Sequence, residues 1–548
     1  MTIREIPLAP YADQRPGTSG LRKKVSVFRQ PGYLEAFIQS LFDALPEAVG
    51  HSAAGKTLVL GGDGRFFNDV AIRTIVPIAA ANGVSRLLVG RDGLLSTPAA
   101  SAVIRKHGCF GGIILSASHN PAGADGDFGI KFNTANGGPA PERVTEAIWR
   151  HSRLIASYRT IDSPPPPFDQ IGATRFAGME VAVIDPVADY LELMQRIFDF
   201  DRLRELFARG FRLRFDAMSA VTGPYAREIF ERQLGAAAGT AVNAEPKPDF
   251  AGRHPDPNPV HAAELIAALM AADGPDIGAA SDGDGDRNLI VGRQLVVGPS
   301  DSLAVLAANA RLVPWFKGGL CGVARSMPTS RAVDRVAEAL GIACWETPTG
   351  WKYFGSLLDA GRIALCGEES AGTGSDHVRE KDGLWAVLFW LSIIAERRLT
   401  VAEIVHDHWR RFGRHFYARH DYEALDSERA EDLMMRMRRS TANLPGRRFG
   451  DFAVVVADDF AYTDPIDGSA VAQQGVRVGF ADGSRIVYRL SGTGTEGATL
   501  RVYLEHYEPD PARQLVAAEV GLAPLIPIAA AIADIERITG RSAPSVIA

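Results

Sequence analysis

The chain has 548 residues, of which 46% are hydrophobic and 23% charged, as expected for a soluble globular protein of three or four domains without one single core. Its 59 basic and 65 acidic residues give a net charge of -6, which excludes a broad basic surface for nucleic acid or an anionic membrane. Small-molecule partners are therefore expected.

The N-terminal part contains no feature of export or nucleotide binding. The first residues, MTIREIPLAPYADQ, carry charges and prolines where a secretory signal needs an apolar run, so a cytoplasmic location is expected. The segment GHSAAGKT (50–57) has the letters of a P-loop, but a helical pattern precedes it and the strand-like TLVLGG follows it. A P-loop requires the reverse order, so the match is rejected.

Strand and helix patterns alternate from Lys56 onward. The repeated unit is a short apolar strand, a small-residue turn and a helix, which predicts mixed or parallel sheets. Three such α/β units are expected, and they contain the strand–helix pairs KTLVLGGDGR with DVAIRTIVPIAAANG, LRFDAMSA with GPYAREIFERQLG, and GLCGVARSMP with SRAVDRVAEALG. The prolines of SPPPPFDQ and the segment EPKPDFAGRHPDPNP predict irregular connections.

A serine pair follows the apolar strand GGIIL, in the segment SASHNP (116–121). A hydroxyl exposed where a strand ends is placed to act as a nucleophile or to receive a group. Ser118 is the preferred residue. From the residues alone, Ser116 and an ordinary hydrogen-bonded turn remain alternatives.

The acidic segment SDGDGDRN (281–288) is the clearest chemical signal. Asp282, Asp284 and Asp286 alternate with glycine, so in extended backbone their carboxylates would share one side. Such neighbouring charges repel by roughly 2 kcal/mol per pair at an effective dielectric of about 20, and a cation would remove this cost. Oxygen ligands in a compact site favour Mg²⁺, whereas the spacing does not fit a calcium EF-hand loop.

The C-terminal part has a different pattern of predicted secondary structure. Segments such as FAVVVADDF, VRVGFADGSRIVYRLS and ATLRVYLEHY predict an antiparallel sheet, closed by a helix near LIPIAAAIADIERITG. The segment GTGTEG (492–497) has the letters of a dinucleotide loop, but a strand pattern follows it, so that interpretation is rejected. With Arg489 and Arg501 beside it, the loop is predicted to bind one phosphate, although an ordinary turn is the alternative.

Two further expectations concern burial. The four cysteines, Cys109, Cys321, Cys344 and Cys366, are scattered and form no C-x-x-C pair, which predicts free thiols in the core. The longest apolar segments, GLWAVLFWLSIIA and VGLAPLIPIAAAIA, are shorter than the ~20 residues that a bilayer needs. Both are predicted to be buried helices.

Six segments together resemble the α-D-phosphohexomutases, and CGEESAGTG is similar to the glucose-specific branch of that family. The segments are PGTSGLRKKV, SASHNPAGADGDFGIKFN, SDGDGDRN, TPTGWKYFG, CGEESAGTGSDHVREKDGLWA and RLSGTGTEGATLR. The resemblance implies three similar α/β domains with mixed sheets and a fourth α+β domain around a central cleft. The predicted division is 1–188, 189–298, 299–412 and 413–548.

The resemblance also implies roles for individual residues. Ser118 matches the phosphorylated serine, whose phosphoryl oxygen would join the three aspartates as a metal ligand, with His119, Lys131 and Arg287 as further catalytic residues. Residues implied in substrate binding are Thr18, Arg22, Thr349, Gly350, Glu368, Ser370 and Lys381. Those implied in phosphate binding are Arg489, Ser491, Gly492, Thr493 and Arg501.

The implied activity is the interconversion of glucose 1-phosphate and glucose 6-phosphate. It would use Mg²⁺, a phosphoserine and a glucose 1,6-bisphosphate intermediate that also primes the enzyme and reorients in the cleft. The general base is left open between His119 and Lys131. A monomer or weak homodimer is expected. The alternatives are a catalytically inactive structural relative, a mutase for mannose or glucosamine phosphates, and a metal-dependent phosphatase.

Overall fold

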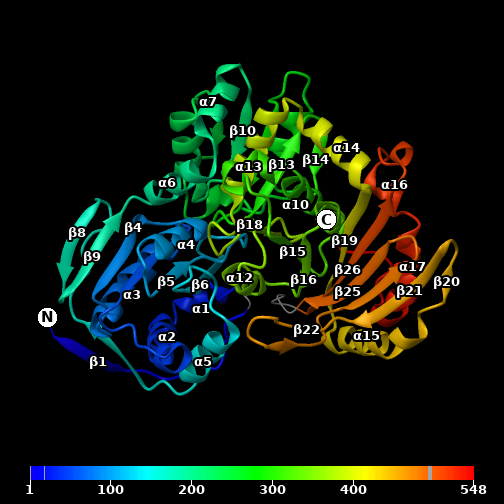
Figure 1. The fold of residues 1–548 in the computed structure, drawn as a ribbon. Coiled ribbons are helices and arrows are strands. Elements are labelled where there is room, and N and C mark those ends of the chain that lie inside the picture. Colours follow the sequence, from blue (N-terminus) through cyan, green and yellow to red (C-terminus); the bar gives the residue numbers. More distant parts are fainter. Residues whose placement is uncertain (1, 18, 492–496) are drawn as a thin grey trace.

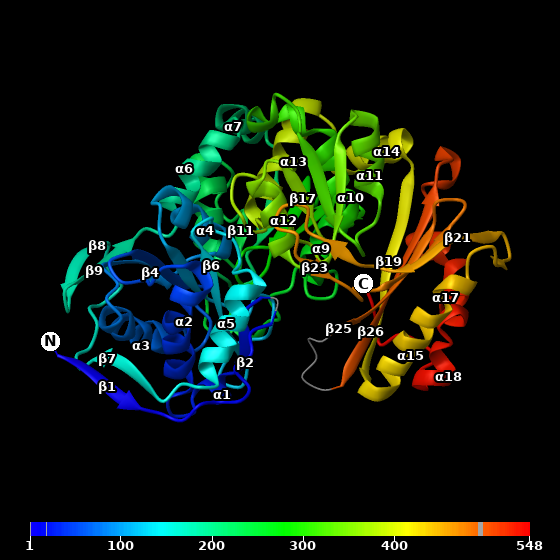
Figure 2. The same ribbon diagram turned by 60° about the horizontal axis from the view of Figure 1, so that its bottom comes forward.

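Four larger β-sheets, each with its own helices, form an arc in the computed structural model, and two further sheets have two strands each (Figures 1 and 2). The structure describes residues 2–17, 19–491 and 497–548. The predicted alternation of strands and helices therefore holds through the first three sheets. The change to strand-rich sequence near residue 414 coincides with the start of the fourth sheet.

The first sheet has seven strands and is mixed. Its central strands β5, β3, β4 and β9 run parallel, and antiparallel strands form both edges. The order is β2 (Leu21–Lys24), β6 (Asp127–Thr134), β5 (Gly111–Leu115), β3 (Thr57–Gly62), β4 (Arg86–Leu94), β9 (Met179–Ile184) and β8 (Gly172–Phe176). A separate ribbon pairs β1 (Ile3–Pro7) with β7 (Ser157–Ile161).

Helices cover both faces of this sheet because alternate strand residues point to opposite sides. Leu58 and Leu60 of β3 join the core under one face, whereas Val59 between them joins the core under the other. The first face is covered by α2 (Tyr33–Val49), α3 (Asn68–Ala81) and α5 (Glu142–Ser152), and the second by α4 (Thr97–Lys106). Since α2 precedes β3, the P-loop match was rightly rejected.

The second and third sheets lie in the middle of the arc (Figure 1). The second contains β11 (Ala241–Val242), β10 (Leu213–Asp216), β12 (Ile277–Ser281), β13 (Asn288–Gly292) and β14 (Leu295–Val297). The third contains β16 (Ala343–Thr347), β15 (Gly322–Ser326), β17 (Leu365–Gly367) and β18 (Thr373–Ser375). Their helices are α6 (Ala188–Ile197), α7 (Phe200–Ala208), α8 (Thr222–Ala226), α9 (Ala263–Met270), α10 (Pro299–Ala308), α11 (Ala332–Leu340), α12 (Trp351–Asp359), α13 (Gly383–Arg397) and α14 (Val401–Phe412).

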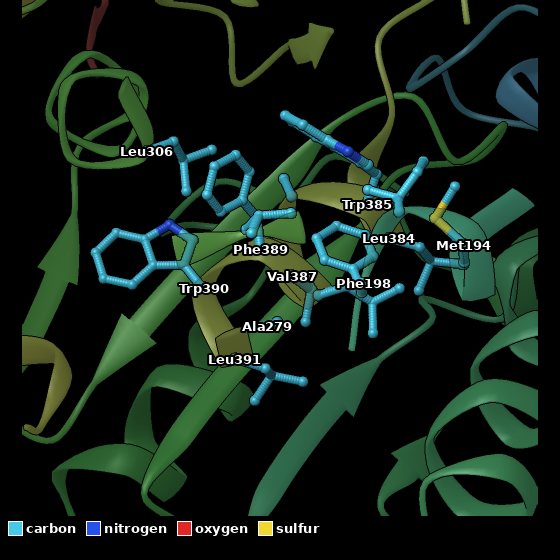
Figure 3. Close-up of a cluster of buried hydrophobic side chains, with 14 of the residues drawn as sticks. Met194, Phe198, Ala279, Leu306, Leu384, Trp385, Val387, Phe389, Trp390 and Leu391 are labelled. Atoms are coloured by element: carbon cyan, nitrogen blue, oxygen red, sulfur yellow. The ribbon is translucent and has the colours of Figure 1, made fainter. Parts of the chain in front are cut away.

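Helix α13 lies at the centre of the largest hydrophobic cluster, as Figure 3 shows for Trp385, Phe389 and Leu391. All its residues from Gly383 to Ala395 are buried, which confirms the predicted buried helix GLWAVLFWLSIIA. The same cluster runs from Val59 of the first sheet to Trp409 of α14. One buried cluster is therefore shared by the first three sheets, and each of these sheets also contributes to a separate cluster.

The fourth sheet is antiparallel throughout, as predicted. Its order is β20 (Arg448–Phe449), β21 (Phe452–Asp459), β24 (Val476–Phe480), β25 (Arg485–Ser491), β26 (Ala498–Glu508), β19 (Arg414–Leu425) and β27 (Val546–Ile547). Its helices are α15 (Ser427–Ser440), α16 (Ala518–Leu522), α17 (Leu525–Ala533) and α18 (Ile535–Thr539).

Two burial expectations need correction. The segment VGLAPLIPIAAAIA is not one buried helix, because it divides into α16 and α17 around Pro524 and leaves Ile526 39% exposed. Asp534, with φ +50°, then interrupts the predicted closing helix.

All four cysteines are free, but Cys321 is exposed and Cys344 half-buried, so only Cys109 and Cys366 are core thiols. Among the described residues, no helix combines the length and apolar character that a bilayer crossing requires.

His408 of α14 gives the fold an acid-sensitive position. It is buried, neither ring nitrogen has a hydrogen-bond partner among the described residues, and burial lowers its pKa to about 3. In the unfolded chain this histidine is therefore protonated below pH ~6.5, whereas in the folded protein it stays neutral until about pH 3. The free energy of unfolding is unaffected at higher pH and falls by about 1.4 kcal/mol per pH unit within this window.

We expect His408→Leu, which removes the titrating group at similar volume, to flatten the acid dependence of stability. Urea unfolding of both proteins between pH 7 and pH 4 measures it. His406→Leu is the matched control, because its ring lies on the same helix but is only partly buried. Parallel acid dependences of wild type and His408→Leu would contradict the assignment.

Candidate active site

Ser118 lies in a tight turn just beyond the end of β5. Its φ of +53° is in the left-handed region, which non-glycine residues rarely adopt. The backbone N–H donates to Ser116 Oγ at 2.7 Å, and Ser118 Oγ donates to Asp282 Oδ2 at 2.9 Å. Ser116 Oγ instead donates to Asp63 at 2.6 Å. Of the two serines, Ser118 is thus the one whose hydroxyl contacts the acidic loop.

Arg65 holds the Ser118 turn from behind. Its guanidinium donates to the carbonyl oxygen of Ser118 at 2.5 Å and to that of Asp127 at 3.0 Å, and it forms an ion pair with Asp63 at 2.9 Å. Both side chains of this pair are fully buried. From the sequence, GGDGR was predicted only to end a strand. The charges of Asp63 and Arg65 directly after a buried strand are, however, a signal of a polar site.

Replacing Arg65 with methionine should therefore destabilise the fold and displace Ser118. Removing one partner of a buried ion pair costs about 3 to 5 kcal/mol, because Asp63 is left charged and unpaired. Chemical denaturation measures this loss, and residual turnover measures the displacement. Arg73→Met is the control, since Arg73 forms an exposed ion pair with Asp69 within helix α3. Equal stability of the two variants would contradict the role of Arg65.

The three acidic residues converge in a turn rather than along a strand. One oxygen from each of Asp282, Asp284 and Asp286 lies within 4.8 Å of the others. The predicted clustering is thus found, but the predicted extended backbone is wrong, because Gly285 has φ +82° and the segment folds back after β12. A side chain at Gly283 would place its Cβ 2.5 Å from the carbonyl oxygen of Ser118, so the glycine lets the two loops touch.

The acidic cluster is suited to a divalent cation. Asp284 Oδ1 and Asp286 Oδ1 are buried without a hydrogen-bond partner among the described residues, which leaves them available as ligands. Burial and the neighbouring Asp286 and Asp284 carboxylates raise the pKa of Asp282 well above its usual value. Without a cation this arrangement is electrostatically unfavourable. Hard carboxylate oxygens favour Mg²⁺, so the residues fit the predicted ion.

Cationic side chains surround the same carboxylates. Lys131 Nζ lies 2.5 Å from Asp284 Oδ2, and Lys381 Nζ lies 3.0 Å from Asp286 Oδ2. Although burial acts in the opposite direction, Lys131 lowers the pKa of Asp284 far below its usual value. Thr97, which the sequence interpretation missed, donates to Asp284 at 2.7 Å.

Three further predicted residues lie around the serine. His119 Nδ1 is 3.5 Å from Ser118 Oγ, and burial together with Arg287 lowers the pKa of this imidazole well below its usual value. Arg287 lies 3.4 Å from Asp256 and 4.0 Å from Asp282. Burial lowers the pKa of Arg22, and its Nε is buried without a hydrogen-bond partner among the described residues.

The predicted sugar loop is held close to the acidic turn. Glu368 accepts the backbone N–H of Gly350 at 3.0 Å, and burial raises the pKa of its carboxyl group. Thr349 Oγ1 has no partner among the described residues, and Ser370 is half-buried in the turn after Glu368. The two loops join through a backbone bridge between residues 287 and 372.

The predicted phosphate residues lie apart, on the fourth sheet. Arg489 of β25 is directly opposite Arg501 of β26, so both guanidiniums belong to one face. Arg419, which was not predicted from the sequence, is a third arginine on this sheet, opposite Tyr503 in the pairing of β19 with β26. Ser491 ends β25, whereas Thr18, Gly492 and Thr493 lie outside the described residues. No contact between described residues joins these arginines to Ser118.

Comparisons with known proteins cover the whole chain. Family models match for phosphoglucomutase/phosphomannomutase domain I (13–159), domain II (188–295) and domain III (299–412), and for the C-terminal domain of phosphoglucomutase-1 (414–545). A phosphoglucomutase of Rhizobium radiobacter is 57% identical, with 100% of both chains covered. Phosphoglucomutase-1 of Oryctolagus cuniculus is 50% identical, with 98% of both chains covered.

A solved structure shows the same fold. The parafusin phosphoprotein of Paramecium, described as a phosphoglucomutase in an open form, has a TM-score of 0.93 and 48% identity, covering 100% of this chain and 99% of that one. A phosphomannomutase structure from Thermus thermophilus, at 23% identity and a TM-score of 0.68, supports the fold alone. The chain belongs to the phosphoglucomutase/phosphomannomutase family.

Proposed function

We propose that the chain is a phosphoglucomutase that interconverts glucose 1-phosphate and glucose 6-phosphate through a phosphorylated Ser118. The observation that carries this proposal is the 2.9 Å contact between Ser118 Oγ and Asp282, which joins a strained serine to a buried carboxylate cluster from a distant part of the chain. The full-length similarity to phosphoglucomutases supports the same activity.

In the first half-reaction the O6 hydroxyl of glucose 1-phosphate attacks the phosphorus of phosphorylated Ser118. The bond from phosphorus to Ser118 Oγ breaks, a phosphate ester forms at O6, and the proton lost from O6 ends on Ser118 Oγ as the free hydroxyl. The O6 proton must leave, and His119, whose Nδ1 lies 3.5 Å from Ser118 Oγ, is the group placed to take it from O6 and return it to Ser118 Oγ. Lys131 donates to Asp284, so we assign it charge compensation rather than proton removal.

The bisphosphate then turns so that its phosphate at C1 meets Ser118. The C1–O bond stays intact, phosphorus moves from O1 to Ser118 Oγ, and glucose 6-phosphate is released. Arg489 and Arg501 are proposed to bind the phosphate that is not transferred, since their shared face offers two guanidinium forks. Ser491, Gly492, Thr493 and Thr18 complete the proposed phosphate and substrate contacts.

Hydroxyl recognition is assigned to the loops that meet at the acidic turn. Glu368 accepts hydrogen bonds, and Lys381 and Arg22 supply positive charge near the sugar. Thr349, Gly350 and Ser370 are proposed as neighbouring contacts. Mg²⁺ held by Asp282, Asp284 and Asp286 would neutralise the charge of the phosphoryl group, with Arg287 nearby. Glucose 1,6-bisphosphate is the proposed primer.

The remaining expectations follow from this assignment. We propose a cytoplasmic enzyme that acts as a monomer or weak homodimer, with residues 1–188, 189–298, 299–412 and 413–548 as its domains. A cytoplasmic phosphoglucomutase of Populus tremula, 48% identical, supports the location.

Phosphorus NMR tests the activity directly. With Mg²⁺ and a trace of glucose 1,6-bisphosphate, glucose 1-phosphate should be converted to glucose 6-phosphate, at least about 10-fold more efficiently than mannose 1-phosphate or glucosamine 1-phosphate because differently placed hydroxyls leave buried polar groups unpaired. Omitting the primer should delay the reaction. Release of inorganic phosphate without primer would instead indicate a phosphatase.

A further inference from the structure

A cavity lies away from the residues of the candidate active site. Its volume is about 440 Å³, and it is formed by the C-terminal ends of α7 and α13, the start of α14, and the residues flanking β12 and β13. Helices α7 and α13 lie side by side in both views (Figures 1 and 2). This volume is in the range that binds small organic molecules.

The cavity has an apolar floor and a charged rim. Leu206, Phe211, Ile394, Leu399 and Val401 supply the apolar contacts. Four arginines and three carboxylates complete the lining, so its formal charge is positive. An apolar body with one negative group matches this combination.

Most rim charges are already paired. Arg202 bonds to Glu396 at 3.1 Å, Arg209 to Glu205 at 3.2 Å, and Arg293 to Asp276 at 2.9 Å. Glu403 accepts two hydrogen bonds from Thr400 as part of a helix cap. These groups are therefore not free to bind an anion.

Arg398 is the exception on this rim. Arg398 is an exposed residue that lines the cavity, and its guanidinium has no hydrogen bond or ion pair with any described residue. Its backbone has φ +55° at the end of α13, a position where glycine is usually preferred. Because this exposed guanidinium lies beside apolar lining residues, it is available to pair with a carboxylate.

The cavity and the acidic turn lie at opposite ends of the same three elements. Strand β12 runs from Asp276 in the cavity to Asp282, and β13 runs from Arg287 to Arg293 in the cavity. Helix α13 begins at Gly383, whose N–H donates to Gly285 of the acidic turn at 3.0 Å, and ends at Arg398. These elements are buried along their length and span about 20 Å.

We propose that this cavity is a regulatory site for a small monocarboxylate with an apolar body. The carboxylate pairs with Arg398, the apolar body covers the floor, and occupancy is transmitted to residues 282–288 through β12, β13 and α13. The proposal goes beyond the phosphoglucomutase activity and does not depend on it, because binding and backbone protection are both measurable without turnover.

Hydrocinnamate, an aromatic monocarboxylate, is a suitable probe, and its neutral amide is the matched ligand. Calorimetry or ligand-observed NMR at millimolar concentration should show the acid binding at least about ten-fold more tightly than the amide, because only the acid forms a charge-assisted pair. Arg398→Gly, which relieves the backbone strain while removing the charge, should remove this preference. Arg398→Lys should retain most of it.

Arg541→Gly is the control variant, because Arg541 is an exposed arginine near the C-terminus. It should bind hydrocinnamate as wild type does. Hydrogen exchange should change at residues 282–288 when wild type is saturated and stay unchanged in Arg398→Gly. Absence of binding to wild type, equal binding of acid and amide, or unchanged exchange at saturation would each overturn the proposal.

Discussion

Ser118→Ala is expected to abolish phosphoryl transfer, with turnover of glucose 1-phosphate falling by a factor on the order of 10⁴ or more. The hydroxyl is the only group of this side chain that can hold the phosphoryl group, and its contact with Asp282 places it beside the carboxylate cluster. Intact mass spectrometry before and after exposure to glucose 1,6-bisphosphate measures the reaction. Wild type should gain one phosphoryl group and Ser118→Ala none.

Ser116→Ala is the matched control for this result. Its hydroxyl lies two residues away, accepts the Ser118 N–H and donates to Asp63, so it positions the turn without carrying the phosphoryl group. This variant should still gain one phosphoryl group, although more slowly. Phosphorylation of Ser118→Ala together with its loss in Ser116→Ala would assign the reaction to the other serine.

Asp284→Asn should produce the second large effect, a loss of metal-dependent behaviour. Asp284 is fully buried, accepts hydrogen bonds from Thr97 and Lys131 through Oδ2, and keeps Oδ1 free. Asparagine removes the charge that balances both the cation and Lys131. We expect Mg²⁺ affinity to fall by about 100-fold or more, by analogy with the loss of groups that orient metal ligands.

Thermal unfolding with and without Mg²⁺ separates this effect from simple loss of activity. Wild type should melt at a higher temperature as Mg²⁺ increases, because the ion binds only the folded state. Asp284→Asn should show little or no shift. Asp201→Asn, at a side chain that is 89% exposed, should respond as wild type does. A full Mg²⁺ shift in Asp284→Asn would remove Asp284 from the metal site.

The acidic segment shows what a local sequence pattern can predict and what it cannot. Its alternating aspartates predicted a cation site, and their oxygens do converge. The extended backbone behind that prediction was wrong, because hydrogen bonds such as Gly285 N–H to Asp282 O fold the segment into a turn. The composition of the segment was informative about chemistry, while its conformation depended on contacts with Ser118 and Gly383.

Apolar segments show the same limit for burial. GLWAVLFWLSIIA was predicted to be a buried helix and is one, since a helix that is apolar on every side requires neighbours all around. VGLAPLIPIAAAIA has a similar composition, but its helices α16 and α17 pack against β19 and β26 and leave residues such as Ile526 exposed on the other side. Hydrophobicity alone did not distinguish the two environments.

By itself the sequence determined the strand–helix alternation, the antiparallel C-terminal sheet and the identity of the acidic and serine segments, because periodicity, turn residues and charge spacing are local properties. Only the tertiary structure decided that Ser118 rather than Ser116 contacts Asp282, that Arg65 supports the turn, and that Arg398 lines a cavity without a partner in the described part of the chain. Those contacts join residues far apart in the chain, and their geometry depends on how the sheets and helices pack.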